Sequence, residues 1–381
     1  MSLRQKIVDE IRERGPIPFS RYMELCLYHS ELGYYSRPAE QFGKDGDFYT
    51  VSDIHAVFGR LLARQFDQMW RVIGCPRRIE IVELGPGRGL FAQDVLDWSE
   101  NKFPAFFAAL GYWLVERSPA LRERLEHTLE RHFRRGKASL TSLPLDASHP
   151  GVSPPEHPVI IFANEFFDAL PVEILGPEGE LRIAEREGRL VETWVSAPPE
   201  QLSFLDRYGV HPQPGERMEI PLMAQRQMAA AAASIERGFL IAIDYGYTRD
   251  QQLRGRYGGT LVTYRRHSLG RTPYEAPGEQ DITAHVNFTA LAAAAEQQGM
   301  QVQPLVTSAQ FLMGIGEANQ FADAFDECRR PEERAKVALQ LKHLVAPAGT
   351  GETFQVLLAS KGVAPDRVAS LDGLRLRTGG R

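Results

Sequence analysis

IEIVELGPGRGLFAQDVL is the stretch from Ile79 to Leu96, and it decides the fold. Its first six residues form a short apolar run that predicts a buried strand, and its last seven residues have helical character. The turn between them, residues 85–89, carries three glycines, which let the backbone turn tightly and let a ligand lie against main-chain N–H groups. A strand, a glycine-rich turn and a helix in this order predict the first unit of an α/β sheet with a ligand site at the turn.

The same alternation of apolar runs and helices continues along the chain. Further candidate strands lie at residues 111–116, 138–143, 158–164, 239–244, 302–306 and 353–358, with a helix at 285–298. Strands that are apolar on both faces need cover on both sides. The pattern therefore predicts an α/β fold with a doubly wound parallel sheet.

We expect a helical N-terminal cover and two inserted substrate elements around this core. Ser20 is the expected N-cap of the second helix of the cover. The first insertion has polar-alternating strands followed by an alanine-rich helix, and the second is rich in Gly, Pro and Arg. The predicted divisions are 1–75 for the cover, 76–171 for the first part of the core, 172–236 for the first insertion, 237–246 for a core strand, 247–284 for the second insertion, 285–361 for completion of the core and 362–381 for a frayed tail.

Composition and charge exclude several classes of protein. Hydrophobic residues make up 43% and charged residues 24% of the 381 residues, which is ordinary for a globular chain. The formal net charge is −5, whereas proteins that bind nucleic acid normally carry a basic excess, so no nucleic-acid partner is expected. No long apolar run and no signal peptide are evident, and we expect a cytoplasmic protein without membrane insertion. The three cysteines, Cys26, Cys75 and Cys328, lie far apart, so neither a disulfide nor a metal site is expected.

The glycine-rich turn favours S-adenosyl-L-methionine (SAM) over a dinucleotide. A dinucleotide fingerprint would need its third glycine at position 90, which is Leu90, and the glycines are Gly85, Gly87 and Gly89 instead. Glu83 would repel a pyrophosphate but attract a cationic group. SAM has a cationic amino-acid part and no phosphate, so these three glycines and Glu83 are its predicted contacts.

Two more residues at strand ends are assigned to the cofactor. Glu116 ends the second strand, where a carboxylate can accept hydrogen bonds from ribose hydroxyls. A solvated strand end is the alternative for this residue. Asn164 ends the strand at 158–164 and is expected at the same edge of the sheet.

The segment that ends this strand and follows it is a candidate site for a cationic group of the substrate. It reads Asn164-Glu165-Phe166-Phe167-Asp168-Ala169-Leu170-Pro171. The carboxylates of Glu165 and Asp168 could hold a guanidinium or ammonium group, which makes this turn a candidate site. The alternative is the acidic start of a helix, stabilised by the helix dipole.

Three residues further along the chain are predicted to contact the substrate: Asp244, Tyr245 and His285. A polar strand end is the alternative for the first two, and a helix-capping neighbourhood is the alternative for His285.

Taken together, the motifs of this chain resemble those of a known family, the MidA-like proteins, which include a mitochondrial complex I assembly factor. The shared motifs are Tyr22-Met23, Leu27-Tyr28, Gly33-Tyr34-Tyr35, Gly46-Asp47-Phe48 with Thr50, Phe58-Gly59, residues 83–89, Val115-Glu116-Arg117-Ser118-Pro119, residues 164–172, Asp244-Tyr245-Gly246, Gly259-Thr260-Leu261 and residues 281–288. Together they extend from about residue 15 to residue 316 in the order of the family.

The resemblance implies a class I SAM-dependent methyltransferase fold and methyl transfer to an arginine of a protein, with a respiratory complex I subunit as the acceptor of the mitochondrial relative. It also implies that Asp47 and Thr50 close over SAM and that Glu165 and Asp168 face the acceptor, and we therefore predict that Glu165 and Asp168 are catalytic.

Other functions stay open at this stage. The chain could be a SAM-binding assembly factor or chaperone without turnover, or it could methylate a small molecule. An NAD-dependent oxidoreductase is disfavoured by Leu90. A protein substrate is the expected partner, and the chain could also form a homodimer.

Overall fold

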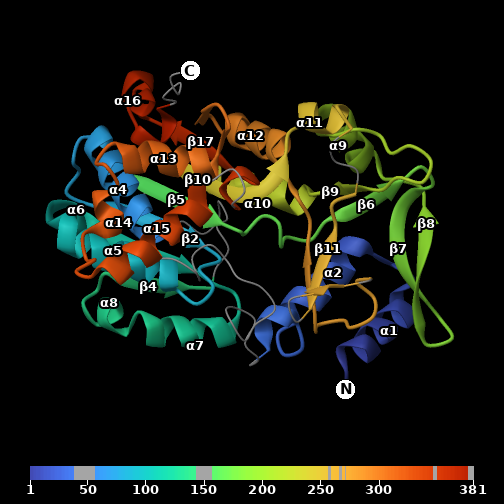
Figure 1. Ribbon diagram of the computed structural model, residues 1–381. Coiled ribbons are helices and arrows are strands. Elements are labelled where there is room, and N and C mark those ends of the chain that lie inside the picture. The colour runs from blue at the N-terminus through green and yellow to red at the C-terminus, as the bar shows by residue number, and fades with distance from the viewer. Residues whose placement is uncertain are drawn as a thin grey trace.

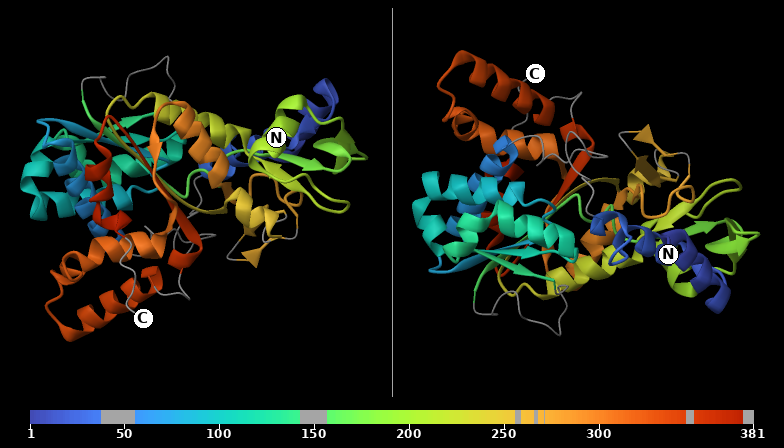
Figure 2. Two further views of the ribbon diagram at one scale, coloured as in Figure 1. Left: turned by 90° about the horizontal axis from the view of Figure 1, so that it is seen from above. Right: turned by 90° about the horizontal axis from the view of Figure 1, so that it is seen from below.

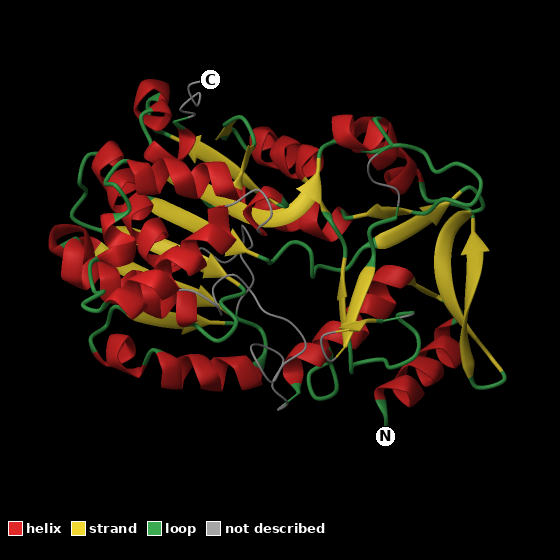
Figure 3. Cartoon of the chain, viewed as in Figure 1, coloured by secondary structure: helices red, strands yellow, loops and turns green. Residues whose placement is uncertain are grey.

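The computed structural model describes residues 1–37, 56–142, 157–255, 259–265, 268–270, 272–345 and 350–375. These residues form two lobes, a large one built on a mixed sheet and a smaller one with antiparallel strands (Figures 1 and 3). Figure 2 shows from two further directions that the N-terminal helices belong to the smaller lobe.

The large lobe contains the predicted α/β sheet. Its strand order is β15-β17-β10-β5-β2-β3-β4, and the short strands β14 and β16 pair with β10 and β17. The bounds are β2 Ile79–Leu84, β3 Leu110–Val115, β4 Ala138–Thr141, β5 Val159–Asn164, β10 Gly238–Tyr247, β14 Val286–Asn287, β15 Gln301–Val302, β16 Val306–Thr307 and β17 Phe354–Lys361. The strands from β4 to β10 are parallel, as predicted. The prediction of a wholly parallel sheet is wrong at the other edge, because β17 runs antiparallel to β10, and β15 and β16 pair antiparallel with β17.

The strand order places a ligand crevice at β2 and β5. The chain proceeds outward from β2 to β3 and β4, and then returns to the other side of β2 to form β5. In open α/β sheets a crevice forms outside the carboxyl ends of the strands where the order reverses in this way. The glycine-rich turn after β2 and the acidic segment after β5 therefore lie beside the same crevice.

Apolar side chains bury both faces of the sheet, as the sequence predicts. Ile79 and Ile81 of β2 pack on one face with a set of helices, while Val82 and Leu84 pack on the other face with α10 and α12. The helices of the first face are α4 Ala56–Ile73, α5 Leu90–Lys102, α6 Pro104–Ala109, α7 Pro119–Thr128, α8 Glu130–Arg134, α13 Ser308–Glu317, α14 Ala322–Phe325 and α15 Pro331–Val345. Those of the second face are α10 Leu222–Ala233 and α12 Phe288–Gln297.

The second lobe joins three segments that lie far apart in the sequence. Its elements are α1 Leu3–Arg14, β1 Ile17–Pro18, α2 Phe19–Tyr28, η1 Tyr34–Ser36, β6 Glu173–Gly176, β7 Gly179–Arg186, β8 Arg189–Val195, α9 Pro199–Tyr208, β9 Met218–Ile220, α11 Arg249–Leu253, β11 Val262–Arg265, β12 Ser268–Leu269 and β13 Asp281–Thr283. Ile17 pairs with Ile183 across β1 and β7, and both are buried in one core with Ile282 of β13. The N-terminal helices and the two insertions thus share one hydrophobic core.

The predicted N-terminal cover, residues 1–75, does not pack as one structural unit. Residues 1–36 pack in the second lobe, whereas α4 packs on the main sheet. Ser20 is not an N-cap, because α2 begins at Phe19 and the Ser20 hydroxyl donates a hydrogen bond of 2.5 Å to Glu173.

The C-terminal segment is more ordered than expected. α16 Pro365–Ala369 and η3 Asp372–Leu374 follow β17, and Val368 and Leu371 are fully buried against the main core. The prediction of a frayed tail is therefore wrong for residues 365–374, because these two apolar side chains anchor them. The helices at 308–345, together with η2 Thr350–Glu352, interrupt the segment predicted as completion of the core.

Within the described ranges, no helix is both long and apolar enough to cross a membrane. The same ranges contain no cluster of His, Cys, Asp or Glu side chains suited to a metal ion.

Candidate active site

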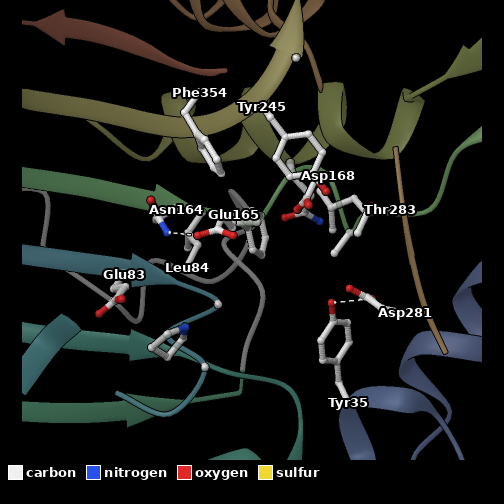
Figure 4. A pocket seen from close by; sticks show the side chains of 18 of the residues that line it. Tyr35, Glu83, Leu84, Asn164, Glu165, Asp168, Tyr245, Asp281, Thr283 and Phe354 are labelled. Atoms are coloured by element: carbon white, nitrogen blue, oxygen red, sulfur yellow. Dashed lines mark hydrogen bonds between the residues drawn. The ribbon is translucent and has the colours of Figure 1, made fainter. Parts of the chain in front are cut away.

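A cavity of about 870 Å³ lies between the two lobes (Figure 4). The core contributes the carboxyl ends of β2, β3, β5 and β10 to its wall, and the second lobe contributes α2, η1, β11 and β13. The sequence-predicted residues that line it are Glu83, Gly85, Gly87, Glu116, Asn164, Glu165, Asp168, Tyr245 and His285. Asp47 and Thr50 lie outside the described residues.

The glycine-rich turn brings the backbone to the cavity wall. Gly85 has a φ of +63°, and a Cβ atom there would lie 2.9 Å from Cδ2 of Phe166. Gly87 also has a positive φ of +54°. Glycine is favoured at such backbone angles because other residues are strained there.

Gly89 has a different role from the predicted one. It does not line the described part of the cavity, and it precedes α5 with a φ of +79°. A Cβ atom at this position would lie 2.7 Å from Cδ2 of Leu125 on α7. Gly89 therefore permits close packing of α5 against α7, and the expectation of a cofactor contact is corrected.

Glu83 is a buried carboxyl group at the cofactor end of the cavity. Only 4% of its surface is exposed, and the Tyr112 hydroxyl donates a hydrogen bond of 2.8 Å to its Oε2. Burial raises the pKa of Glu83 to about 8, although the Tyr112 hydrogen bond opposes this shift. A cationic ligand group would favour the ionised form, in agreement with the role predicted for Glu83.

Glu116 follows β3 on the same side of the cavity. Its Oε1 accepts a hydrogen bond of 2.7 Å from the backbone N–H of Ser118, which fixes the side chain. Burial raises the pKa of Glu116 to about 7, and hydrogen bonds from the backbone of Ser118 and Arg117 oppose the shift. The carboxyl end of β3 thus presents a buried acceptor where the sequence predicts ribose hydroxyls.

These residues fit SAM. The turn at Gly85 leaves room against Phe166 that a Cβ atom would fill, and buried carboxyl groups stand at the ends of β2 and β3. A glycine-rich turn offers backbone donors, Glu83 offers a partner for an ammonium group, and Glu116 offers acceptors for hydroxyl groups.

The turn after β5 presents Glu165 in an unusual backbone conformation. Its φ is +49°, a left-handed value that costs about 1 to 3 kcal/mol for a non-glycine residue and is often found at functional sites. Nδ2 of Asn164 donates a hydrogen bond of 3.1 Å to Glu165 Oε1 (Figure 4). Asn164 therefore orients a predicted catalytic carboxylate while it also lines the cavity.

Asp168 is the second carboxylate of this turn. It is 5% exposed, lines the cavity, and its Oδ1 has no hydrogen-bond partner among the described residues. Burial raises the pKa of Asp168 to about 6, and the nearby Tyr245 hydroxyl opposes the shift. A buried carboxylate oxygen without a partner is costly unless a ligand supplies a donor.

Asp244 lies behind this turn and does not line the described part of the cavity. Its Oδ2 accepts hydrogen bonds from the backbone N–H groups of Phe167, at 3.0 Å, and Asp168, at 3.3 Å. Its Oδ1 accepts one from the N–H of Tyr245 at 3.0 Å. Asp244 thus holds the turn and the end of β10 together, and the predicted direct contact with substrate is corrected to a positioning role.

Tyr245 and His285 form one wall near Asp168. Their ring centroids are 5.2 Å apart in an edge-to-face arrangement, and Phe354 contacts Tyr245 in the same way at 5.5 Å. The backbone N–H of His285 donates a hydrogen bond of 3.1 Å to Thr260 Oγ1. Burial lowers the pKa of His285, so the neutral imidazole is favoured.

Sequence reasoning expected substrate elements in the insertions but assigned no site role to four residues of the second lobe. Asp281, Thr283, Tyr28 and Tyr35 line the cavity opposite the core strands, and the Tyr35 hydroxyl donates a hydrogen bond of 3.0 Å to Asp281 Oδ1 (Figure 4). These residues belong to motifs shared with the resembling family, which was the available signal. Their meeting depends on a contact across 246 residues, which no local pattern predicts.

The described wall of the cavity is strongly acidic. Seven carboxyl side chains and two arginines, Arg88 and Arg117, line it. The seven are Glu24, Glu83, Glu116, Glu165, Asp168, Asp281 and Glu352. Such a wall favours cationic ligands.

Comparisons with known proteins agree with this reading of the fold. A family model for S-adenosyl-L-methionine-dependent methyltransferases matches residues 61–306. "Protein arginine methyltransferase NDUFAF7 homolog, mitochondrial" of Drosophila melanogaster is 30% identical, with 95% of this chain and 85% of that protein covered. "Protein arginine methyltransferase NDUFAF7, mitochondrial" of the zebrafish Danio rerio is 29% identical, with 93% of this chain and 86% of that protein covered. A Burkholderia thailandensis structure bound to S-adenosyl-homocysteine has a TM-score of 0.83 and 28% identity, and the match covers 98% of this chain and 94% of that one.

The relatives contradict the expected cytoplasmic location, because the fly, zebrafish and mouse proteins are all named as mitochondrial. A sequence in which neither a secretory signal nor a membrane span is evident can still belong to a compartment other than the cytoplasm. The family model covers more than half of the chain, and SAM is the cofactor of that family. The chain therefore belongs to the family of S-adenosyl-L-methionine-dependent methyltransferases.

Proposed function

We propose that this protein transfers a methyl group from SAM to an arginine side chain of a protein substrate. The observation that carries the proposal is the unpartnered Oδ1 of buried Asp168, which lies in an acidic wall beside Glu165 and near the cofactor turn. A guanidinium group supplies charge and several N–H donors to such a wall. The relatives are named protein arginine methyltransferases, which supports the same acceptor.

SAM, when bound, supplies the methyl group as an electrophile. The residues of this chain then have to hold the acceptor nitrogen in line with it and to remove one proton for each methyl group transferred. Glu165, oriented by Asn164, would hold one guanidinium nitrogen, and Asp168 would hold another.

Asp168 is the better candidate for the proton acceptor. A guanidinium group keeps its proton at neutral pH, so the proton that transfer releases needs a base. Burial brings the pKa of Asp168 to about 6, which leaves it mostly ionised at pH 7 yet a stronger base than an exposed aspartate.

The test uses purified protein, SAM with a labelled methyl group and the subunits of respiratory complex I, the acceptor class implied by the family resemblance. We expect label in methylarginine after hydrolysis of the substrate. Glu165→Gln and Asp168→Asn should each lower turnover at least about 100-fold. Their affinity for S-adenosyl-homocysteine, measured by calorimetry, should stay within about threefold, because neither residue is assigned to the cofactor.

Exposed residues of the second lobe provide matched controls, Glu200→Gln and Asp206→Asn, which should retain wild-type turnover. Label in lysine or in a small molecule would refute the arginine acceptor. Cofactor binding without any transfer would favour an assembly factor that does not turn over.

Two further parts of the proposal concern partners. The acceptor is a protein, as the names of the relatives imply. The homodimer stays a prediction, and light scattering on the purified protein would measure the mass that decides it.

A further inference from the structure

We infer that Asp281, on the second lobe, binds the acceptor guanidinium from the side opposite Glu165 and Asp168, so that the acceptor cation is held between the lobes. This inference rests on the proposed function and adds a specificity-determining residue to it.

The geometry places Asp281 at the cavity wall in a fixed orientation. It is 3% exposed, and its Oδ1 accepts hydrogen bonds of 3.0 Å from the Tyr35 hydroxyl and from the backbone N–H of Ile282. Three residues beyond Asp281, the N–H of Ala284 donates a hydrogen bond of 2.9 Å to the carbonyl oxygen of Asp168. The backbone thereby ties β13 to the turn that carries Asp168.

Two tyrosines, Tyr28 and Tyr35, lie close enough to both Asp281 and Asp168 to feel the charge of each carboxylate. Burial and the negative charges of Asp281 and Asp168 raise the pKa of both Tyr28 and Tyr35. The Tyr28 hydroxyl donates a hydrogen bond of 2.9 Å to the carbonyl oxygen of Ala169, which joins α2 of the second lobe to the acidic turn. Figure 4 shows Asp281 and Tyr35 facing the cavity from one side and Glu165 from the other.

A second observation points to a ligand donor at this place. Asp168 Oδ1 is buried, lies in the cavity wall and lacks a partner among the described residues. A buried cation loses its hydration, and carboxylates on two opposite sides of it can offset that loss. Carboxylates on one side alone would leave some of its N–H donors unpaired.

The chemistry of guanidinium requires contacts at more than one edge. The group is planar and carries five N–H donors, so a single short turn can satisfy one edge only. Glu165 and Asp168 lie three residues apart on one such turn, and Asp281 supplies a carboxylate from another element. Asp281 can therefore pair with donors that the turn of Glu165 and Asp168 leaves unpaired.

The test measures binding of a probe and does not depend on turnover. An acetylated and amidated Gly-Arg-Gly peptide is titrated into protein saturated with S-adenosyl-homocysteine, and the citrulline peptide of the same shape is the uncharged control. We expect the arginine peptide to bind wild type at least tenfold more tightly than the citrulline peptide. Asp281→Asn should lose at least tenfold of the affinity for arginine and little of that for citrulline, and its affinity for S-adenosyl-homocysteine should stay within twofold.

Asp206→Asn makes the same chemical change at an exposed position of α9 in the same lobe and should bind as wild type does. If Asp281→Asn does not fold, Tyr35→Phe keeps the inference testable, because it frees the Asp281 carboxylate from one of its donors and should weaken arginine binding about threefold.

The outcomes separate the inference from the proposed function. If wild type prefers the arginine peptide to the citrulline peptide and Asp281→Asn binds the arginine peptide equally tightly, the role of Asp281 is overturned. The proposed function is not affected by that result. Wild type that does not distinguish the two peptides overturns the arginine acceptor and the inference with it.

Discussion

Replacing Glu83 by Gln should stabilise the cofactor-free protein near neutral pH. The carboxyl group is 4% exposed and its pKa rises from 4.5 to about 8 in the folded chain. A carboxyl that binds its proton more tightly in the folded than in the unfolded state makes stability fall as pH rises between these two values. Glutamine keeps an acceptor for the Tyr112 hydroxyl but cannot ionise, so it escapes this loss.

The magnitude follows from the shift. Between the ordinary pKa and pH 7 the gap is about two and a half units, and at about 1.4 kcal/mol per unit it amounts to about 3 kcal/mol. Unfolding 381 residues has an entropy of about 0.8 kcal/mol per kelvin, so the Tm of Glu83→Gln should exceed that of wild type by about 4 °C at pH 7. At pH 5 the free-energy gain should fall below about 1 kcal/mol, because this pH is close to the ordinary pKa of 4.5 and ionisation of the carboxyl then stabilises the unfolded chain only slightly.

Differential scanning calorimetry of the cofactor-free proteins at pH 5 and pH 7 measures this, and Glu332→Gln on the exposed surface of α15 is the matched control. A gain in Tm that is equal at both pH values, or a loss at pH 7, would show that Glu83 does not carry the raised pKa.

The same variant tests the contact with the cofactor. S-adenosyl-homocysteine carries a cationic ammonium group that favours ionised Glu83, so its affinity for wild type should rise from pH 6 to pH 8 with release of protons. Glu83→Gln should bind it at least about tenfold more weakly at pH 8 and should lack this pH dependence. Equal affinities at pH 8 would remove Glu83 from the cofactor site.

The remaining predictions concern positions around the cavity. Gly85→Ala should lose about 1 to 3 kcal/mol of stability and also weaken cofactor binding in calorimetry, because its φ is +63° and its Cβ would press on Phe166 at the cavity wall. Gly89→Ala should lose similar stability through its contact with Leu125 but keep cofactor affinity within about threefold; the reverse result would restore Gly89 as a cofactor contact. Asp244→Asn should lower turnover at least about tenfold with cofactor affinity unchanged, because an amide cannot accept all three backbone N–H bonds; a larger effect on the cofactor than on turnover would contradict this.

The core of the fold was predictable because its signals are local. The run from Ile79 to Leu84 is apolar enough to be buried on both faces, and the three glycines after it permit a tight turn. β5 is buried along nearly its whole length in the same way, so the central strands and the glycine-rich turn could be derived from short stretches of sequence. The single strand predicted at 302–306 is instead two short strands, β15 and β16.

The second lobe and the C-terminal segment were not predictable in this way. β1 has only two residues, Ile17 and Pro18, and it becomes a strand only because β7 lies beside it. Val368 and Leu371 are isolated apolar residues in a polar stretch, and their burial depends on helices that precede them by dozens of residues. The secondary structure and burial of such segments are determined by tertiary contacts and not by local residue propensity.

The two ends of the cavity differ in how the chain builds them. The proposed cofactor end comes from β2, β3 and their following turns, so among the described residues it depends mainly on the core lobe. The acceptor end combines Asp168 of the core with Asp281 and Tyr35 of the second lobe, and the hydrogen bond from Ala284 to Asp168 joins them. A change in how the lobes pack would therefore disturb the acceptor site first and leave cofactor binding largely intact. In this architecture, tight binding of S-adenosyl-homocysteine alone says little about whether the acceptor site is assembled.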